Sequence, residues 1–98
     1  MTIHDGYPPV VNYSKANQLL RTVATELGWK ERIVTAEPVM GGEDFAYYLE
    51  HVPGAFWFLG AHPGGNELIP FCHHPAYDFN DAILETGIRL HSELALRF

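Results

Sequence analysis

Residues 55–61 constrain the fold of this chain more than any other segment. They read Ala-Phe-Trp-Phe-Leu-Gly-Ala and contain no polar side chain, whereas a strand with one face in water alternates apolar and polar residues. A strand that is apolar on both faces needs helices above and below its sheet, and neighbouring strands for its backbone groups. The segment therefore predicts a central strand of an α/β sheet.

Three amphipathic helices are expected around this strand. The first begins at Ser14, a residue type that caps helices, and ends at Gly28, a usual residue after a C-cap. The second carries Glu43 and Asp44 in its first turn, where the helix dipole favours acidic side chains. Asn80 is expected to cap the third. The predicted inward positions are Ala16, Leu19, Leu20, Val23, Ala24 and Leu27, then Phe45, Tyr48, Leu49 and Val52, then Ile83, Leu84, Gly87, Ile88, His91, Leu94 and Ala95.

A second, shorter strand is expected at residues 33–36, which read Ile-Val-Thr-Ala and stop before Pro38. The elements then follow in the order helix, strand, helix, strand, helix, which is typical of the last part of an α/β sheet. Two strands leave such a sheet incomplete, and 47% of the 98 residues are hydrophobic. We therefore expect the apolar surface to need a partner, either a second copy or a missing N-terminal half.

The charge of the chain excludes several classes of partner. Six Lys and Arg against twelve Asp and Glu give a formal net charge of −6, so the chain offers no basic patch for nucleic acid or anionic lipid. One cysteine cannot form an internal disulfide, and no apolar stretch is long enough to span a membrane. We expect a soluble, cytoplasmic protein with no nucleic-acid or membrane partner.

A glycine pair, Gly41-Gly42, stands where the shorter strand passes into the second helix. Glycine lets a backbone approach a ligand closely, and open amide groups at such a turn can donate to a carboxylate or carbonyl oxygen. The pair is therefore a candidate substrate-binding element. Glu43 and Asp44 could serve as an acid, a base or a ligand, but capping of the second helix accounts for them without a catalytic role.

Two adjacent imidazoles, His73 and His74, lie in a loop stiffened by Pro75. Successive side chains of an extended loop diverge, so at most one of the two can ligate a given metal, and an ordinary surface histidine is the alternative. A self-contained zinc site would also need Cys72 and His62, but the second closely spaced ligand pair of a structural zinc site is absent. A buried, inert thiol is the better interpretation of Cys72.

Several short motifs follow one another along the chain. They are Gly42-Glu43-Asp44-Phe45-Ala46-Tyr47-Tyr48-Leu49, Val52-Pro53-Gly54-Ala55-Phe56, Phe58-Leu59-Gly60, His73-His74-Pro75 and Tyr77-Asp78-Phe79, before a closing amphipathic helix. In this order they resemble the C-terminal end of the metal-dependent amidohydrolases. That family includes hippurate hydrolase and the hydrolases of N-acyl-amino acids and indoleacetyl-amino acids, and is similar to carboxypeptidase G and the aminoacylases. The resemblance covers residues 6–98.

The resemblance implies a zinc-peptidase-like α/β catalytic domain with a smaller lid domain inserted into it. Residues 1–12 would be the end of the lid domain and its linker strand, and residues 13–98 the C-terminal part of the catalytic domain. In such enzymes a two-metal centre, of zinc or manganese, lies between the domains. The family pattern His-x-Pro places its late metal ligand on the first His, which here is His73, while His74 takes the variable middle position.

The activity implied by the resemblance is cleavage of the amide bond of N-acyl-amino acids, such as hippurate-like compounds. The metals would polarise the amide carbonyl and activate water, and the Gly41-Gly42 turn would help to orient the substrate. The other ligands and the general-base glutamate of the family lie in the N-terminal part, which this chain lacks. We therefore expect a C-terminal fragment that is inactive alone; the alternative is a non-catalytic oligomerising or interaction fragment.

Overall fold

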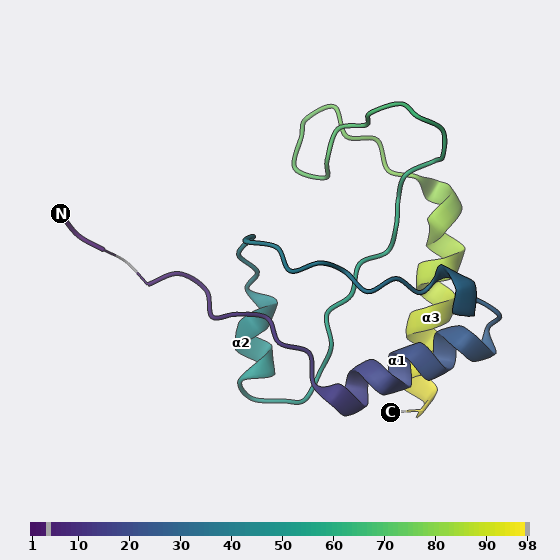
Figure 1. Cartoon of the computed structure of the whole chain (residues 1–98), viewed down its shortest axis with the longest axis horizontal. Helices are drawn as coiled ribbons and strands as arrows, with labels where there is room; N and C mark the ends of the chain where they lie inside the picture. The colour runs from purple at the N-terminus through teal and green to yellow at the C-terminus, as the bar shows by residue number, and fades with distance from the viewer. Residues whose placement is uncertain (4, 98) are drawn as a thin grey trace. The chain divides into compact units, whose positions relative to one another are not determined.

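The computed structural model describes residues 1–3 and 5–97. His4 and Phe98, which fall in the predicted domain ranges 1–12 and 13–98, lie outside the described residues. The chain divides into two compact units, an N-terminal unit (Met1–Trp57) and a C-terminal unit (Phe58–Phe98). The helical elements, labelled in part in Figure 1, are α1 (Ser14–Glu26), the 3-10 turn η1 (Lys30–Arg32), α2 (Phe45–Leu49), the 3-10 turn η2 (Asp81–Ile83) and α3 (Leu84–Arg97).

Helix α1 ends where the sequence predicted, at a glycine. Gly28 has a φ of 84°, a left-handed conformation that glycine adopts without steric cost. Its N–H donates to the carbonyl of Thr25 at 3.0 Å, and the N–H of Trp29 donates to the carbonyl of Ala24 at 2.9 Å. These two bonds form a Schellman cap, which satisfies carbonyls that the end of a helix leaves open.

The buried face of α1 is also the predicted one. Val23 and Ala24 are buried, with 0% and 7% of their surface exposed. The other predicted inward side chains are half-buried: Ala16, Leu19, Leu20 and Leu27. Because full burial of an aliphatic side chain stabilises a fold by about 1.5–3 kcal/mol, this stripe is a main source of stability in the N-terminal unit.

The extended segment before α1 is fastened to the segment that follows α2. The Asn12 side chain donates from Nδ2 to the Phe56 carbonyl at 2.9 Å, and its Oδ1 accepts from the Phe56 N–H at 2.8 Å. Beside it, the N–H of Tyr13 donates to the carbonyl of Gly54 at 2.9 Å. Tyr13 also occupies the N-cap position of α1 without a side-chain capping bond, so Ser14 is the first helical residue and the predicted cap was wrong by one position.

Helix α2 is shorter than the sequence predicted. It begins at Phe45, so Glu43 and Asp44 precede it, and its first turn contains no acidic residue. Glu43 instead accepts a hydrogen bond on Oε1 from the N–H of Phe45 at 3.2 Å. This bond satisfies one of the amide groups that the start of a helix leaves open.

The five residues of α2 bury one narrow side. Ala46 is buried, with 1% of its surface exposed, and the ring of Phe45 packs against Phe56 with ring centroids 5.5 Å apart. Tyr48 and Val52 were predicted to face inward, but both are exposed. A helix of this length makes little more than one turn, so it cannot bury a stripe that continues to Val52.

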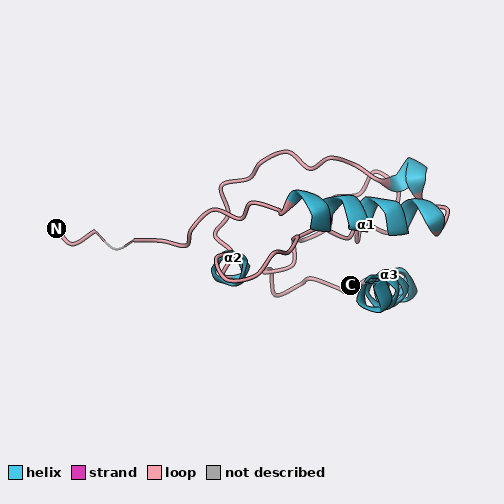
Figure 2. Ribbon diagram, turned by 90° about the horizontal axis from the view of Figure 1, so that it is seen from below, coloured by secondary structure: helices cyan, strands magenta, loops and turns pink. Residues whose placement is uncertain are grey.

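The predicted helix-strand-helix-strand-helix arrangement is not confirmed, because the described residues form no strand (Figure 2). Residues 33–36 and 55–61 both run as irregular chain. A strand forms only where a neighbouring strand takes its backbone hydrogen bonds, and the part of the chain that is described supplies no such neighbour. At Phe56 the side-chain amide of Asn12 takes that role in part.

In the C-terminal unit, Asn80 stands at the start of the helical segment, as predicted. Its Oδ1 accepts from the N–H of Ala82 at 3.1 Å, which caps η2 and the helix α3 that continues from it. Its Nδ2 donates to the carbonyl of Ala61 at 3.1 Å. The Asn80 side chain thus joins the start of the helical segment to Ala61, which lies 19 positions earlier.

Helix α3 buries a narrower face than its apolar pattern predicted. Leu90, which was not among the predicted inward positions, is the buried residue of this helix. The predicted inward residues Ile83, Gly87 and Leu94 are half-buried on the same side as Leu90, but Leu84, Ile88, His91 and Ala95 are exposed. The helix carries apolar residues around more than one face, so the sequence pattern alone could not select the face that packs.

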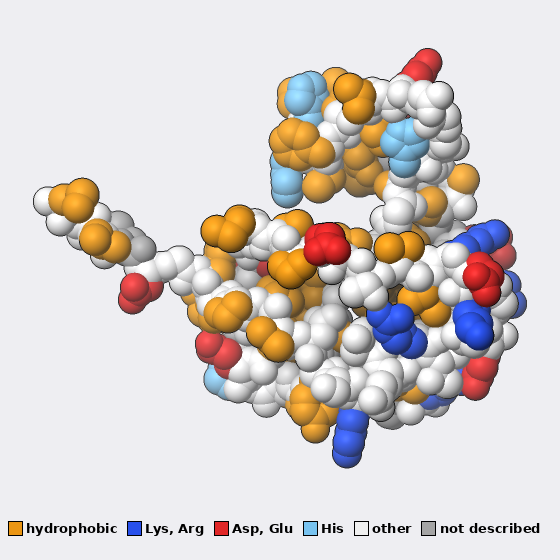
Figure 3. Space-filling view, viewed as in Figure 1, with side chains coloured by type: hydrophobic (Ala, Val, Ile, Leu, Met, Phe, Trp, Pro, Cys, Tyr) orange, Lys and Arg blue, Asp and Glu red, His pale blue; other side chains and the backbone are white. Residues whose placement is uncertain are grey.

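Large apolar side chains are exposed on both units, and many are visible as orange atoms in Figure 3. Among the described residues the buried hydrophobic core consists of Val23, Ala24, Ala46 and Leu90, which is small for a chain with this content of apolar residues. None of the described helices combines the length and the apolar character that crossing a membrane requires.

Candidate functional site

The glycine turn, residues 40–42, precedes α2 in the N-terminal unit. Gly41 and Gly42 are both exposed, and neither has a positive φ. A Cβ on Gly41 would meet no atom within 4 Å, whereas a Cβ on Gly42 would lie 2.8 Å from Cδ2 of Tyr7. A side chain at position 42 would therefore push the Tyr7 ring aside, while the surroundings of Gly41 are open.

One member of the acidic pair after the glycine turn has a structural role. The carboxylate of Glu43 accepts from the N–H of Phe45, which accounts for Glu43 without a catalytic role. Asp44 occupies the N-cap position of α2 without a side-chain capping bond. Within the described residues, the Asp44 side chain has no partner that would indicate chemistry.

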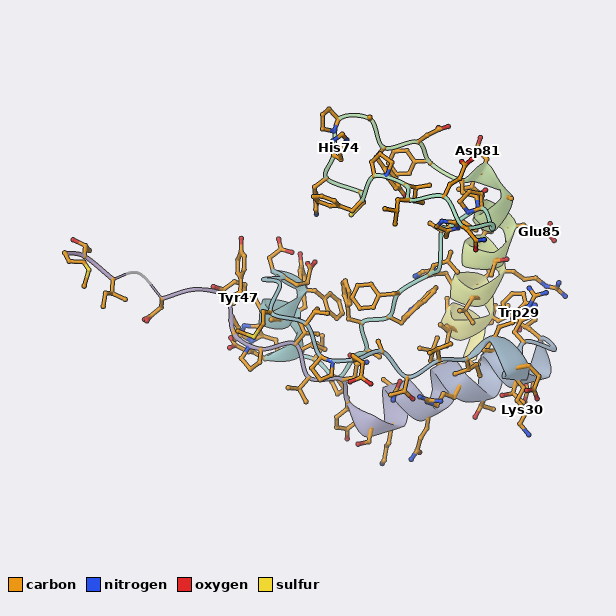
Figure 4. The ribbon with its side chains drawn as sticks, turned by 45° about the horizontal axis from the view of Figure 1, so that its top comes forward. Trp29, Lys30, Tyr47, His74, Asp81 and Glu85 are labelled. Atoms are coloured by element: carbon orange, nitrogen blue, oxygen red, sulfur yellow. The ribbon has the colours of Figure 1, made fainter. Side chains whose placement is uncertain are left out.

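The imidazole turn, residues 71–77, lies in the long loop of the C-terminal unit, where Figure 4 labels His74. Two backbone bonds shape it: the His74 N–H donates to the carbonyl of Phe71 at 2.9 Å, and the Tyr77 N–H donates to the carbonyl of His74 at 3.0 Å. In addition, Nδ1 of His74 accepts from the N–H of Ala76 at 3.0 Å. His74 therefore holds its own turn together.

This bond to Ala76 occupies the lone pair of Nδ1 of His74. A metal ligated through Nδ1 would have to displace the Ala76 N–H. His73 is exposed, and within the described residues its ring makes an aromatic contact with Phe71, with centroids 6.4 Å apart, but no hydrogen bond.

The described residues contain no group of three or more His, Cys, Asp and Glu side chains that could hold a metal ion.

The interpretation of Cys72 as a buried thiol was wrong, because this free cysteine is exposed. The expected burial presumed that other residues would cover the loop. His62 binds its own loop, with Nδ1 accepting from the Gly64 N–H at 3.0 Å and Nε2 lying 2.8 Å from the Glu67 carbonyl.

These contacts give no support to the self-contained zinc site that was considered from the sequence. A structural zinc ion needs four protein ligands and a catalytic one needs three, and the residues described here do not fit either set. Gly41 and Gly42 belong to the N-terminal unit and His73 to the C-terminal unit. The glycine pair and His73 therefore belong to different units, and the structure defines no distance between them from which a catalytic step could be derived.

Sequence reasoning missed two residues that shape the glycine turn and its surroundings. Tyr7 lies against Gly42 and packs edge-on against Tyr47 of α2, with ring centroids 5.8 Å apart and an interplanar angle of 77°. Asn12 fastens the same extended segment to Phe56. The sequence offered two weak signals, an aromatic residue before a proline pair and an asparagine just before a helix. Both indicate the local structure around these residues, but neither indicates which distant residue they contact.

The molecule also has a shallow apolar hollow on α2 and the turn after it. Tyr47, Tyr48, His51 and Val52 line it, and Figure 4 labels Tyr47. The hollow is open, and three of its four lining side chains are aromatic rings. Gly41, Gly42 and His73, the residues predicted to bind substrate or metal, do not line it, so it is not the candidate substrate site.

Comparison with known proteins identifies relatives over almost the whole chain. The pattern of peptidase family M20/M25/M40 matches residues 1–97. The chain is 39% identical over 98 residues to a protein of Bacillus subtilis (strain 168) that carries the name amidohydrolase YhaA, covering 99% of this chain and 24% of that protein. It is 37% identical over 81 residues to the N-acetyl-L-cysteine deacetylase of the same organism, covering 83% of this chain and 18% of that protein.

A plant relative gives a similar match. The chain is 32% identical over 92 residues to IAA-amino acid hydrolase ILR1-like 4 of Arabidopsis thaliana, covering 94% of this chain and 21% of that protein. No solved structure matches the chain. The chain spans about a fifth to a quarter of the length of the curated relatives it matches. The resemblance predicted from the motifs is confirmed, and the chain belongs to peptidase family M20/M25/M40.

Proposed function

We propose that this chain is a segment of a metal-dependent amidohydrolase that cleaves the amide bond of N-acyl-amino acids, such as hippurate-like compounds. The observation that carries the proposal is the family match over residues 1–97. Relatives named as an N-acetyl-L-cysteine deacetylase and an IAA-amino acid hydrolase agree with the proposed substrate class. Residues 1–12 are proposed to end a lid domain and residues 13–98 to belong to the catalytic domain.

His73 is the residue that we propose as the metal ligand of this segment. Its ring nitrogens have no hydrogen bond within the described residues, whereas Nδ1 of His74 is engaged by the N–H of Ala76. A neutral imidazole nitrogen is a preferred ligand for zinc and is also used with other divalent metals such as manganese. This difference between two adjacent imidazoles supports His73 over His74.

Gly41 and Gly42 are the residues that we propose to contact the substrate. Both are exposed, and neither has a side chain that would keep a ligand away from the backbone amide groups. A backbone amide is a suitable donor for the carboxylate or carbonyl oxygen that every N-acyl-amino acid carries.

A cytoplasmic location is also proposed. It fits the single, exposed and unpaired cysteine, since disulfides are rare in that compartment.

The chain by itself is proposed to be inactive. One imidazole cannot hold a catalytic metal that needs three protein ligands and an open position, and the described residues contain no cluster that would complete the set. The remaining ligands are proposed to come from the rest of a longer protein, since the relatives are about four to six times as long as the matched region.

A chimeric enzyme tests the proposal. In the N-acetyl-L-cysteine deacetylase of Bacillus subtilis, the matching region is replaced by this chain, and release of cysteine from N-acetyl-L-cysteine is measured together with bound metal. We expect an active chimera that loses bound metal and nearly all turnover on His73→Ala. His74→Ala is the comparison variant and should lose much less of both, because it removes only the bond to Ala76 within the turn. Equal losses for the two variants would refute the choice of His73, and an inactive chimera with normal folding would refute the proposed function.

A second candidate, a non-catalytic oligomerising role, is favoured by one observation. Phe58, Phe71, Phe79 and Ile88 are each between 65% and 76% exposed, and apolar surface of this kind tends to be covered by association. The candidate predicts dimers or larger species at micromolar concentration by sedimentation velocity. A compact monomer under those conditions would exclude it.

A further inference from the structure

We propose that Tyr7 is a positioning residue whose ring fixes the backbone of the glycine turn, residues 40–42. The inference rests on the proposed substrate role of Gly41 and Gly42, and it extends that role to a residue that is distant in sequence and carries none of the family motifs. Tyr7 acts through the turn in this proposal and need not touch the substrate itself.

A side chain at position 42 would have to displace the ring of Tyr7. A Cβ built on Gly42 would lie 2.8 Å from Cδ2 of Tyr7 and 3.5 Å from Cε2. Real Cβ atoms essentially never approach a neighbour closer than 3.0 Å. The edge of the tyrosine ring therefore lies directly against the α-carbon of Gly42.

Gly41 provides the matched contrast. A Cβ on Gly41 would meet nothing within 4 Å, so an added methyl group there disturbs no packing. The two adjacent glycines thus differ in the space around a Cβ, because Tyr7 lies against Gly42 and no described residue lies against Gly41. The ring can hold Gly42 in place while the backbone at Gly41 remains accessible.

Tyr7 also contacts the helix on the other side of the turn. Its ring lies 5.8 Å from that of Tyr47, at an interplanar angle of 77°, which is the edge-to-face geometry that aromatic pairs prefer. Tyr47 belongs to α2, which begins three residues after Gly42. One ring therefore links the glycine turn to the helix that follows it.

The position of Tyr7 is itself restrained by the segment in which it lies. Pro8 and Pro9 follow it directly, and each proline ring fixes the backbone φ angle. Five and six residues after Tyr7, Asn12 and Tyr13 are hydrogen-bonded to Phe56 and Gly54, respectively. The ring is thus presented to Gly42 by a stiffened segment with a fixed far end, which limits the backbone freedom that two glycines would otherwise have.

The first test measures the backbone order parameter S² by ¹⁵N relaxation at Gly42 and Glu43 in the full 98-residue chain. Tyr7→Ala should lower S² at both residues from the value of a rigid backbone, about 0.85, towards that of a flexible one, below about 0.6. Tyr7→Phe keeps the ring and should leave S² unchanged. Amides of α1 serve as the internal control, because their order parameters report whether the N-terminal unit is still folded.

Alanine substitutions in the turn complete this test. Gly42→Ala should reproduce the effect of Tyr7→Ala by displacing the ring, and the double variant Tyr7→Ala/Gly42→Ala should show no lower S² at Glu43 than Gly42→Ala alone. Gly41→Ala should leave the nuclear Overhauser contact between the Tyr7 ring and Gly42 intact. An unchanged S² in Tyr7→Ala, or equal effects of Gly41→Ala and Gly42→Ala, would overturn the inference.

The second test separates positioning from a merely structural role. In the deacetylase chimera described above, Tyr7→Ala should raise KM for N-acetyl-L-cysteine about two- to tenfold while kcat stays within about twofold, and Tyr7→Phe should restore KM. A fall in kcat with unchanged KM would indicate a structural role and overturn the inference. If the chimera without substitutions is inactive, the proposed function fails, and the order parameters of the 98-residue chain still decide whether Tyr7 fixes the turn.

Discussion

Substitution of Asn12 should release the segment that follows α2, because this side chain carries both long-range bonds to Phe56. Nδ2 donates to the Phe56 carbonyl at 2.9 Å and Oδ1 accepts from the Phe56 N–H at 2.8 Å. A typical hydrogen bond contributes a net 0.5–1.5 kcal/mol, so the pair should contribute about 1–3 kcal/mol. Asn12→Ala removes both bonds and should destabilise the attachment of Phe56 to the Asn12 segment by about 1–3 kcal/mol.

Asn12→Asp makes the argument sharper, because it preserves shape and changes one bond. The carboxylate can still accept from the Phe56 N–H, but it loses the donor and places an oxygen against the Phe56 carbonyl oxygen. Two acceptors at that distance repel each other, so Asn12→Asp should destabilise the contact at least as much as Asn12→Ala. An isosteric side chain should thus be no better than a truncated one.

Amide hydrogen exchange at Phe56 measures the effect directly. A loss of 1–3 kcal/mol corresponds to exchange that is about 5- to 150-fold faster for Asn12→Ala. Asn66→Ala is the matched control, because Asn66 is exposed and should leave Phe56 unaffected. Unchanged exchange at Phe56 in both Asn12 variants would refute the reasoning, as would an equal effect of Asn66→Ala.

Two further predictions concern stability and can be checked by urea unfolding of the whole chain. Gly28→Ala should destabilise by about 1–2 kcal/mol because Ala is strained at a φ of 84°, whereas Gly60→Ala, with open space around it, should change stability by less than about 0.5 kcal/mol; equal effects would contradict the assigned helix end. Leu90→Ala should cost about 2–5 kcal/mol because Leu90 is buried. Leu96→Ala, at an 82% exposed position, should cost less than about 0.5 kcal/mol, and a reversed order would show that α3 packs through another face.

Features set by neighbouring residues could be predicted from the sequence. The stripe of α1 and its glycine end follow from helix periodicity and backbone sterics, and Val23 and Gly28 occupy the predicted places. The cap at Asn80 depends on a bond to a residue two positions away. In each case the partner lies within a few residues, where the helix itself fixes the geometry.

Features that need a distant partner could not be predicted in the same way. Residues 55–61 have the composition of a central strand, but a strand also needs a neighbour, and none of the described segments forms one. The apolar pattern of α3 covers several faces, so it did not single out Leu90. The sequence also gave no sign that Asn12 would take part of a neighbouring strand's role at Phe56.

For the candidate site the sequence named residues but gave no geometry. The motifs pointed to the family that the match over residues 1–97 confirms, whereas the roles of His73 and the glycine pair stay predictions. The bond between Ala76 and His74 is a physical argument for His73 that the pattern of residues did not contain. The role of Tyr7 depends on an approach across 35 residues of sequence, which no local pattern encodes.

Zinc titration of the 98-residue chain tests the central claim most directly. That claim is that this segment contributes one imidazole to a metal centre whose other ligands lie elsewhere. Isothermal titration calorimetry should show no saturable zinc binding at micromolar concentrations, in agreement with the absence of a three-ligand cluster among the described residues. Binding of one zinc ion per chain at micromolar affinity would contradict the account.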